Sequence, residues 1–308
     1  MPAAPVRPGR PRRLVYLGTP DAAVAPLRAL VDAGFEVALV VSQPDRRRGR
    51  GAALLPSPVK QAAVELDLPV TDRVDDVVAP GVDADLGVVV AFGRLIKPHV
   101  LDRLPMVNVH FSLLPRWRGA APVERAVLAG DTETGVCVMQ LEAGLDTGPV
   151  HAVERTPIDP EETVDELRDR LVAIGARLLV DTLRGGLGDP VAQEGEPTYA
   201  AKIDPAELEI DWARPADEVL RLVRLGRAWT TFRGRRLRVL RASPEDPAGA
   251  AGGAAGAAPP PGTLEGPFVA TGAGRLRLVT VQPEGRPAQP VEAWRNGARP
   301  TPAERLGP

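Results

Sequence analysis

Residues 86–91 read Leu-Gly-Val-Val-Val-Ala, an unbroken apolar run of the length of one β-strand. Strands of a parallel sheet are covered by helices on both faces, so they are apolar at every position rather than at alternate ones. The run is therefore typical of a central strand in a parallel sheet. Upstream, Leu14–Gly18 and Val37–Val41 are shorter runs of the same kind.

Helical spacing appears between these runs and after them. Asp21 is placed to cap a helix whose apolar residues recur at Val24, Leu27, Leu30 and Val31. Pro58–Glu65 begins another helix, and Glu162–Leu183 is the longest segment with helical spacing. Alternating strands and helices predict an α/β domain with an open, mostly parallel, Rossmann-like sheet that binds ligands at the carboxyl ends of its strands.

The last third of the chain has a different pattern. Residues 187–208 lack periodicity, and we expect residues 1–190 to form one domain, 191–208 a linker and 209–308 a second domain. After a short helix at Asp217–Leu225, strands are predicted at Trp229–Phe232, Leu237–Ala242, Gly262–Leu264, Phe268–Thr271 and Leu276–Val281. Short strands with glycine-rich turns indicate a small barrel or sandwich, and the Ala/Gly/Pro tract 248–261 is expected to be a mobile loop.

The composition excludes several classes of protein. Of the 308 residues, 44% are hydrophobic and 25% are charged, and no apolar run approaches the ~20 residues that cross a bilayer. Met1–Arg13 has no apolar segment of a secretory signal, so a cytoplasmic location is expected. The single cysteine, Cys137, excludes an internal disulfide and a multi-cysteine metal site. Its apolar neighbours favour a buried thiol over a nucleophile.

The net charge of -2 conceals an uneven distribution. Residues 209–308 hold 15 arginines, no lysine and 10 acidic residues, so this part is positive while the rest is negative. A positive module on a negative enzyme domain suits a polyanionic substrate. The alternative is a solvated surface in a chain that uses arginine far more than lysine.

Residues 108–122 carry the polar groups that indicate catalysis: Asn-Val-His-Phe-Ser-Leu-Leu-Pro-Arg-Trp-Arg-Gly-Ala-Ala-Pro. Asn108 and His110 end an apolar run, and residues i and i+2 of a strand point to one face. Asp146 follows in the turn Gly144–Gly148. An amide, an imidazole and a carboxylate favour acyl transfer, with donors for a developing oxyanion and a group to manage a proton. This convergence outweighs the alternative that His110 is a core histidine.

A series of motifs in constant order and spacing resembles the methionyl-tRNA formyltransferase family. The motifs are Gly18–Asp21, Ser42–Asp45, Gly49–Gly51, Pro56–Lys60, Val90–Gly93, Asn108–Pro122, Ala129–Val136 and Gly144–Gly148, with looser similarity near Thr198–Ile203 and Ile210–Trp212. The Asn-x-His pair with a later Asp is shared by folate-dependent formyltransferases, whereas Arg116–Pro122 looks specific to the tRNA branch. The resemblance implies the formyltransferase fold for 1–190 and an OB-like, tRNA-binding β-barrel for 209–308.

The resemblance also implies a reaction and its site residues. The amino group of methionine esterified to initiator tRNA attacks the formyl carbon of 10-formyltetrahydrofolate, giving formylmethionyl-tRNA for translation initiation. Asn108 and His110 would hydrogen-bond the oxyanion, while Asp146 would keep His110 oriented and charged and help to move the proton. The implied folate-binding residues are Arg94, Leu95 and Ile96, through their backbone, and Ser112, Leu113, Leu114 and Pro115. No metal is implied, and a monomer is expected.

A basic loop, Gln43–Gly51, carries Arg46, Arg47, Arg48 and Arg50. No Gly-Lys-Ser/Thr follows it, so it is not a phosphate loop, and the lone glycine turn at Gly18–Pro20 does not predict a dinucleotide site. In the family that the chain resembles, the matching loop reaches the acceptor stem of tRNA, so these four arginines are predicted to bind tRNA. The alternative is a solvated surface loop. Here Arg47–Arg48 replace the family's common Pro-Ala, and Leu225–Trp229 is shorter than the family's turn.

Three other functions fit part of the sequence. A folate-dependent formyltransferase acting on an amino sugar nucleotide would share the three catalytic residues, but Trp117, Ala120–Ala121 and the basic C-terminal part argue against it. Formylation of glycinamide ribonucleotide would leave about 100 residues unexplained. A catalytically dead RNA- or folate-binding module is disfavoured because Asn108, His110 and Asp146 are all present.

Overall fold

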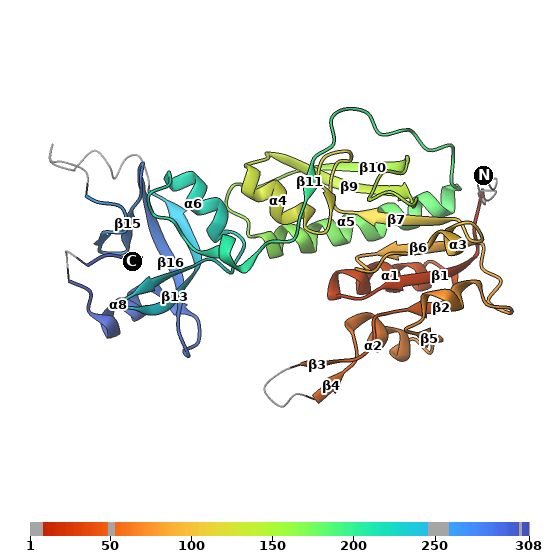
Figure 1. Cartoon of the computed structure of the whole chain (residues 1–308), viewed down its shortest axis with the longest axis horizontal. Helices are drawn as coiled ribbons and strands as arrows, with labels where there is room; N and C mark the ends of the chain where they lie inside the picture. Colours follow the sequence, from red (N-terminus) through yellow and green to blue (C-terminus); the bar gives the residue numbers. More distant parts are fainter. Residues whose placement is uncertain (1–8, 49–52, 246–258, 302–303, 308) are drawn as a thin grey trace. The chain divides into compact units, whose positions relative to one another are not determined.

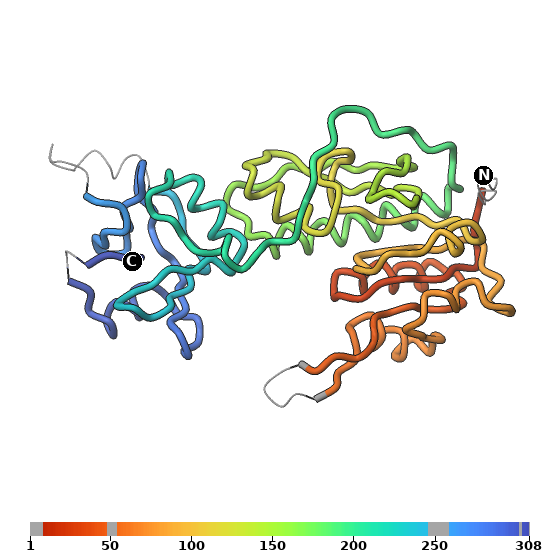
Figure 2. Tube along the Cα trace, viewed as in Figure 1, coloured from red at the N-terminus to blue at the C-terminus, as the bar shows by residue number. Residues whose placement is uncertain are grey.

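The computed structural model describes residues 9–48, 53–245, 259–301 and 304–307. The chain divides into two compact units, whose path is traced in Figures 1 and 2. Unit 1 comprises Met1–Val123, Glu133–Pro157 and Arg168–Ala201, and unit 2 comprises Glu124–Thr132, Ile158–Leu167 and Lys202–Pro308. Arg50 and residues 248–258 of the predicted mobile loop lie outside the described residues.

A seven-stranded sheet forms the centre of unit 1 (Figure 1). Its order is β10(Val150–Pro157), β9(Glu133–Gln140), β7(Met106–His110), β6(Leu86–Val90), β1(Arg13–Gly18), β2(Glu36–Val41) and β5(Val70–Thr71). The five strands from β7 to β5 are mutually parallel, whereas β9 runs antiparallel to both β7 and β10. The predicted Rossmann-like, mostly parallel sheet is confirmed. The order turns back at β1 and β6, where ligands of such sheets bind.

Helices cover both faces of this sheet, which explains the apolar strands. On one face η2(Val74–Val78) and α3(Pro98–Leu101) pack with Val15, Leu17 and Met106 of the strands. On the other face α5(Val164–Gly185) lies so close that a Cβ on Gly175 would come within 3.1 Å of Val109 and 3.3 Å of Val136. The strand β7 is thus packed on both faces.

The predicted helices of unit 1 are present, with one error in detail. Ser57 caps α2(Pro58–Glu65) by accepting a hydrogen bond from the Lys60 N–H at 3.0 Å. Asp21, by contrast, does not cap α1(Val24–Asp32), because it opens the short 3-10 helix η1(Asp21–Ala23), which has no side-chain cap. The short helices α3 and α4(Pro122–Ala129) were not predicted.

Two small two-stranded sheets complete unit 1. The basic segment predicted as a loop is instead part of an antiparallel hairpin, β3(Arg46–Arg48) with β4(Ala53–Leu55). The other pairs β8(Arg118–Gly119) in parallel with β11(Tyr199–Ala200). To reach β11, the chain runs back from the end of α5 past β10, as Figure 2 shows.

Unit 2 is built on an antiparallel sheet, which confirms the predicted β-rich C-terminal domain. Its order is β12(Trp229–Phe232), β13(Arg235–Pro244), β16(Arg275–Pro283), β15(Phe268–Ala270) and β14(Leu264–Glu265), and β17(Gln289–Pro290) pairs with β16. Its core contains Trp212 and packs Phe232 edge-on against Trp294 of α8(Val291–Ala298), with ring centroids 5.1 Å apart. Among its described residues, unit 2 also contains η3(Pro205–Leu208) and α6(Ala216–Val223).

Among the described residues, no helix combines the length and the apolar character that spanning a bilayer requires.

Candidate active site

The strand β7 presents Asn108 and His110 on one face of the sheet, as their spacing predicts. His110 is 5% exposed and pairs across the strands with Cys137 of β9, while Asn108 pairs with Met139. Within the part of the chain that the structure describes, the Asn108 side-chain amide is half-buried and forms no hydrogen bond. A neutral donor is thus free beside the imidazole.

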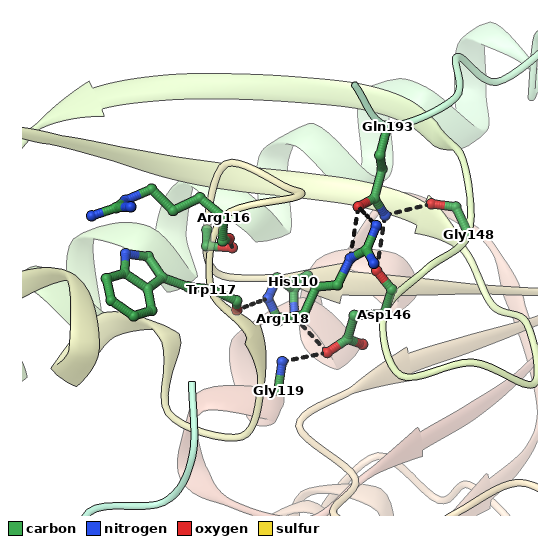
Figure 3. A network of polar contacts seen from close by, with 9 residues as sticks. His110, Arg116, Trp117, Arg118, Gly119, Asp146, Gly148 and Gln193 are labelled. Carbon is green, nitrogen blue, oxygen red and sulfur yellow. Dashed lines mark hydrogen bonds and ion pairs between the residues drawn. The ribbon is translucent and has the colours of Figure 1, made fainter. Parts of the chain in front are cut away.

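Asp146 lies beside His110, although 36 residues separate them in the sequence (Figure 3). Its Oδ2 is 3.7 Å from His110 Nδ1 and accepts a hydrogen bond of 2.8 Å from the Gly119 N–H. On the other edge of the ring, His110 Nε2 donates to the Trp117 carbonyl at 2.9 Å. Because a carbonyl oxygen can only accept, Nε2 carries a proton in this arrangement.

Two loop residues have the left-handed backbone that this geometry needs. Asp146 has φ +49°, a conformation that Asp tolerates better than most residues, and it turns the carboxylate toward the site. Gly119 has φ +121°, and a Cβ there would lie 2.9 Å from the Ala200 carbonyl. Glycine at 119 therefore lets the backbone approach β11 while its N–H points to Asp146.

Burial sets the resting state of the imidazole. It lowers the pKa of His110, because a charged ring loses its solvent, while Asp146 and the Trp117 carbonyl act in the opposite direction. Burial therefore opposes the role expected of Asp146, which is to keep the ring charged. The carboxylate makes the buried ring easier to protonate than it would otherwise be.

The turn after β7 is fixed by its own hydrogen bonds. Ser112 is fully buried, and its hydroxyl donates to the Arg116 carbonyl at 2.6 Å. Leu113, Leu114 and Pro115 are half-buried. The side chain of Ser112 thus shapes the turn, and the following three residues line its accessible side.

The loop after β6 has the free backbone expected of a heterocycle-binding segment. Within the described residues, the N–H and C=O groups of Arg94, Leu95 and Ile96 form no hydrogen bonds. Leu95 is 81% exposed, whereas Ile96 belongs to the core and anchors the loop. The Arg94 guanidinium turns away to the Asp72 carbonyl, at 2.9 Å. These groups fit a ligand read through peptide edges rather than through side chains.

The basic hairpin lies at the carboxyl end of β2, which meets the same edge of the sheet as the end of β7. Arg46 and Arg47 are exposed, and Arg46 hydrogen-bonds the Gln43 side chain. At the base of the hairpin, Lys60 forms an ion pair with Asp45 at 2.8 Å. The Gln43 amide also donates to the Phe92 carbonyl at 3.0 Å, which links the hairpin to the loop after β6.

The polar network of the site includes residues that sequence reasoning missed. Gln193 contacts the Asp146 loop and Arg118, and the Thr198 hydroxyl accepts a hydrogen bond of 2.9 Å from the Trp117 N–H. Both residues come from the segment expected to be a linker. The only sequence signal was the looser similarity near Thr198. Among the described residues, no group of three His, Cys, Asp or Glu side chains is placed to hold a metal.

Comparison with known proteins defines the class first. Residues 12–183 match the family described as "Formyl transferase", and residues 202–299 match "Formyl transferase, C-terminal domain". The fold is that of an N-formyltransferase from Helicobacter canadensis, crystallised with folinic acid and dTDP-3-aminofucose (TM-score 0.64, 15% identity, 87% of this chain and 98% of that one). It is also found in HypX from Aquifex aeolicus in complex with tetrahydrofolic acid (TM-score 0.61, 16% identity, 93% and 47%).

More similar relatives narrow the class. One from Roseobacter denitrificans, named methionyl-tRNA formyltransferase, is 46% identical over 93% of this chain and 96% of its own length. Another with the same name, from Symbiobacterium thermophilum, is 42% identical over 92% of both chains. The chain belongs to the methionyl-tRNA formyltransferase family.

Proposed function

We propose that this protein transfers the formyl group of 10-formyltetrahydrofolate to the amino group of methionine on initiator tRNA. The observation that carries the proposal is the meeting of Asn108, His110 and Asp146 at the end of β7. A free amide, a buried imidazole and a carboxylate are the groups that formyl transfer to an amine requires. The names of the similar relatives support the nature of the acceptor.

Asn108 and His110 act on the charge of the reaction. As the amine attacks, negative charge develops on the formyl oxygen, and the Asn108 amide donates a hydrogen bond to it. His110 becomes the second donor when its Nε2–H leaves the Trp117 carbonyl for that oxygen. Such donors are effective because they are fixed before reaction in a site with little water. His110 is buried, and the Asn108 side chain forms no hydrogen bond with any described residue, so its amide is available to the substrate.

Asp146 acts on the proton. Once the amine has bonded to the formyl carbon, its nitrogen is positively charged and must lose a proton. The folate nitrogen must gain a proton as its bond to the same carbon breaks. Because Nε2 already carries a proton, His110 takes up the new one at Nδ1, which faces Asp146, and the carboxylate favours the charged ring. The pair therefore takes up the proton and returns it, and the Gly119 N–H keeps the carboxylate in place meanwhile.

The folate lies at the carboxyl ends of β6 and β7. When bound, 10-formyltetrahydrofolate supplies the formyl group. The free backbone of Arg94, Leu95 and Ile96 hydrogen-bonds the heterocycle, and Leu113–Pro115 border it, with Ser112 holding their turn. Peptide groups suit this task because the edge of a pterin carries alternating donors and acceptors.

The hairpin β3–β4 binds the acceptor end of the tRNA through Arg46, Arg47, Arg48 and Arg50. Arginine combines phosphate contacts with stacking on exposed bases. The positive residues 209–308 add attraction for the same polyanion.

The test is a formylation assay with three acceptors in parallel: methionyl initiator tRNA, methionyl elongator tRNA and a 4-amino sugar nucleotide. We expect turnover with the initiator, much less with the elongator and none with the sugar nucleotide. Preferential turnover of the sugar nucleotide would establish the alternative, a sugar formyltransferase. The related structure that contains an amino sugar nucleotide is only 15% identical, so it bears on the fold alone.

A further inference from the structure

Gln193 joins two loops of the active site through both ends of its side-chain amide (Figure 3). Its Nε2 donates to the carbonyls of Asp146, at 2.8 Å, and Gly148, at 2.7 Å. Its Oε1 accepts from Arg118 Nε at 3.0 Å and from Arg118 Nη2 at 2.7 Å. All the hydrogen atoms and lone pairs that one amide normally uses are thus committed to residues around His110.

These bonds complete a closed ring of interactions around the carboxylate. Arg118 immediately precedes Gly119, whose N–H holds Asp146 Oδ2. Gln193 holds the main chain of Asp146 from the other side. The carboxylate next to His110 is therefore fixed by one hydrogen bond to its side chain and one to its backbone, and Gln193 ties the two together.

The segment that carries Gln193 is itself fastened on both sides. Val191 exchanges two backbone hydrogen bonds with Val150, at 2.7 and 2.8 Å. At the other end the Thr198 carbonyl accepts from the Arg118 N–H at 2.8 Å, and Ala200 accepts from Ala120 at 2.9 Å. Gln193 thus projects from a segment with little freedom, which a positioning group needs.

We propose that Gln193 is a positioning residue for formyl transfer, because its amide holds the Asp146 loop and Arg118 in the arrangement that places the carboxylate at His110. The inference rests on the proposed catalytic roles of His110 and Asp146. Gln193 itself touches neither the imidazole nor the carboxylate group. Its contribution appears in the chemical step and not in the binding of either substrate.

The variant Gln193→Leu removes all four hydrogen bonds and keeps a side chain of similar size. We expect kcat to fall about 10- to 100-fold, since displacements of about 1 Å in a catalytic group cost up to about 100-fold. KM for both substrates should change less than about 2-fold, and the melting temperature should stay close to that of the parent. Gln193→Glu, which keeps acceptors for Arg118 but has no donor for the two carbonyls, should lose kcat as well.

Gln61→Leu is the matched control. It removes an exposed amide of unit 1 whose described bond is to Glu65 on the same helix, and it should leave kcat and KM unchanged. A drop in melting temperature of Gln193→Leu with unchanged kcat would identify Gln193 as structural and overturn the proposal.

A double-mutant cycle with Asp146→Ala tests whether Gln193 acts through Asp146, separately from whether Asp146 is itself catalytic. If Gln193 acts through Asp146, then adding Gln193→Leu to Asp146→Ala should lower kcat less than 2-fold further. Full additivity of the two losses would overturn the positioning role. High activity of Asp146→Ala alone would instead refute the proposed catalytic role, which is a distinct outcome.

Discussion

At the scale of the residue, the protonation of His110 is decided by burial against charge. The ring is almost fully buried. Its Nε2 donates to the Trp117 carbonyl, and this bond would be lost if Nε2 gave up its proton. Only Nδ1, opposite Asp146, is left to change its protonation. A histidine in this position can gain and lose a proton at Nδ1, so it need not be a permanent cation.

The first prediction concerns this titration. Burial lowers the pKa of His110, so we expect its ring proton resonances to titrate below the ordinary value of about 6.5. Asp146→Asn should lower the pKa further, because the carboxylate is a cause that raises it. Since the folded state then binds fewer protons than the unfolded one, this group supplies stability above pH 6.5 that is lost as pH falls toward its folded pKa.

The measurement is an NMR titration of the histidine ring protons. The chain has three histidines. Replacing His99 and His151 by Gln, one at a time, assigns their signals and leaves that of His110. A His110 pKa above about 6.5, or a rise in Asp146→Asn, would contradict this account.

The second prediction concerns the catalytic groups themselves. His110→Ala and Asp146→Ala should each reduce turnover by about 100-fold or more, because each removes a group that acts mainly in the transition state. Asn108→Ala should lose a similar amount, less where a water takes the place of the amide. Single-turnover formylation measures the effect, and circular dichroism checks folding. Turnover within a few-fold of the parent in His110→Ala would refute the mechanism.

What the sequence predicts at this scale depends on distance along the chain. Asn108 and His110 could be paired from strand periodicity alone, and the resemblance supplied Asp146. Gln193 could not be found, because its partners lie 45 to 75 residues away and it has no periodic context. The role of the Gly119 N–H was hidden for a related reason, since a backbone donor leaves no mark on residue identity.

At the scale of the element, the hairpin β3–β4 shows why a basic segment was taken for a loop. Three consecutive arginines have little strand propensity, and glycines follow them at positions 49 and 51. The strand forms because Arg46 and Arg47 pair with Leu55 and Leu54 across the hairpin. Leu54 is 65% exposed, so the pairing is not held by burial. An element that the core does not stabilise gives no hydrophobic pattern to detect.

The third prediction tests this hairpin. Replacing Arg46, Arg47, Arg48 and Arg50 by Ala should weaken tRNA binding and reduce the slope of log K against log salt. Each neutralised phosphate contributes about one unit of slope for duplex and somewhat less for single strands. Folate affinity should be unchanged, because the free backbone after β6 is not part of the hairpin. Filter binding at several salt concentrations provides the measurement.

A control removes the same number of charges from α1 and α5: Arg28, Arg168, Arg177 and Arg184 to Ala. If the control and the hairpin variant lose equal affinity and slope, the hairpin is only a solvated basic surface. The positive residues 209–308 would then be the main site of tRNA contact.

At the scale of the whole molecule, the sequence predicts the sheet better than its edges. The continuous apolar runs identified β1, β2 and β6, because strands covered on both faces are apolar at every position. β10 is half exposed and carries charged residues, so no such pattern marks it. Unit 2 also takes in Glu124–Thr132 and Ile158–Leu167. In the second of these segments, the carbonyls of Glu162 and Asp159 accept hydrogen bonds of 2.8 and 2.7 Å from Arg224. Those bonds join segments about 60 residues apart, which no local pattern reveals.

The fourth prediction places the folate in unit 1 of the full-length chain. Tetrahydrofolate at about 100 times its Kd should stabilise the folded state by about 2.7 kcal/mol. Amide exchange should slow at Arg94, Leu95 and Ile96, whose N–H groups have no partner among the described residues, and should not change in α8. Mass spectrometry of exchanged peptides measures this. Protection confined to unit 2 would show that the folate site has been misplaced.

One feature of the sheet gives the protein an internal reporter. The sole thiol, Cys137, lies directly across from His110 on β9, and burial raises its pKa to about 11. At pH 8 the thiol is therefore protonated, and because it is also buried, a thiol reagent reaches it only when β9 separates from its neighbours. The rate of labelling thus measures how often β9 separates from β7, with no background from other cysteines. The natural sequence therefore carries its own probe for how often β9 separates from its neighbours.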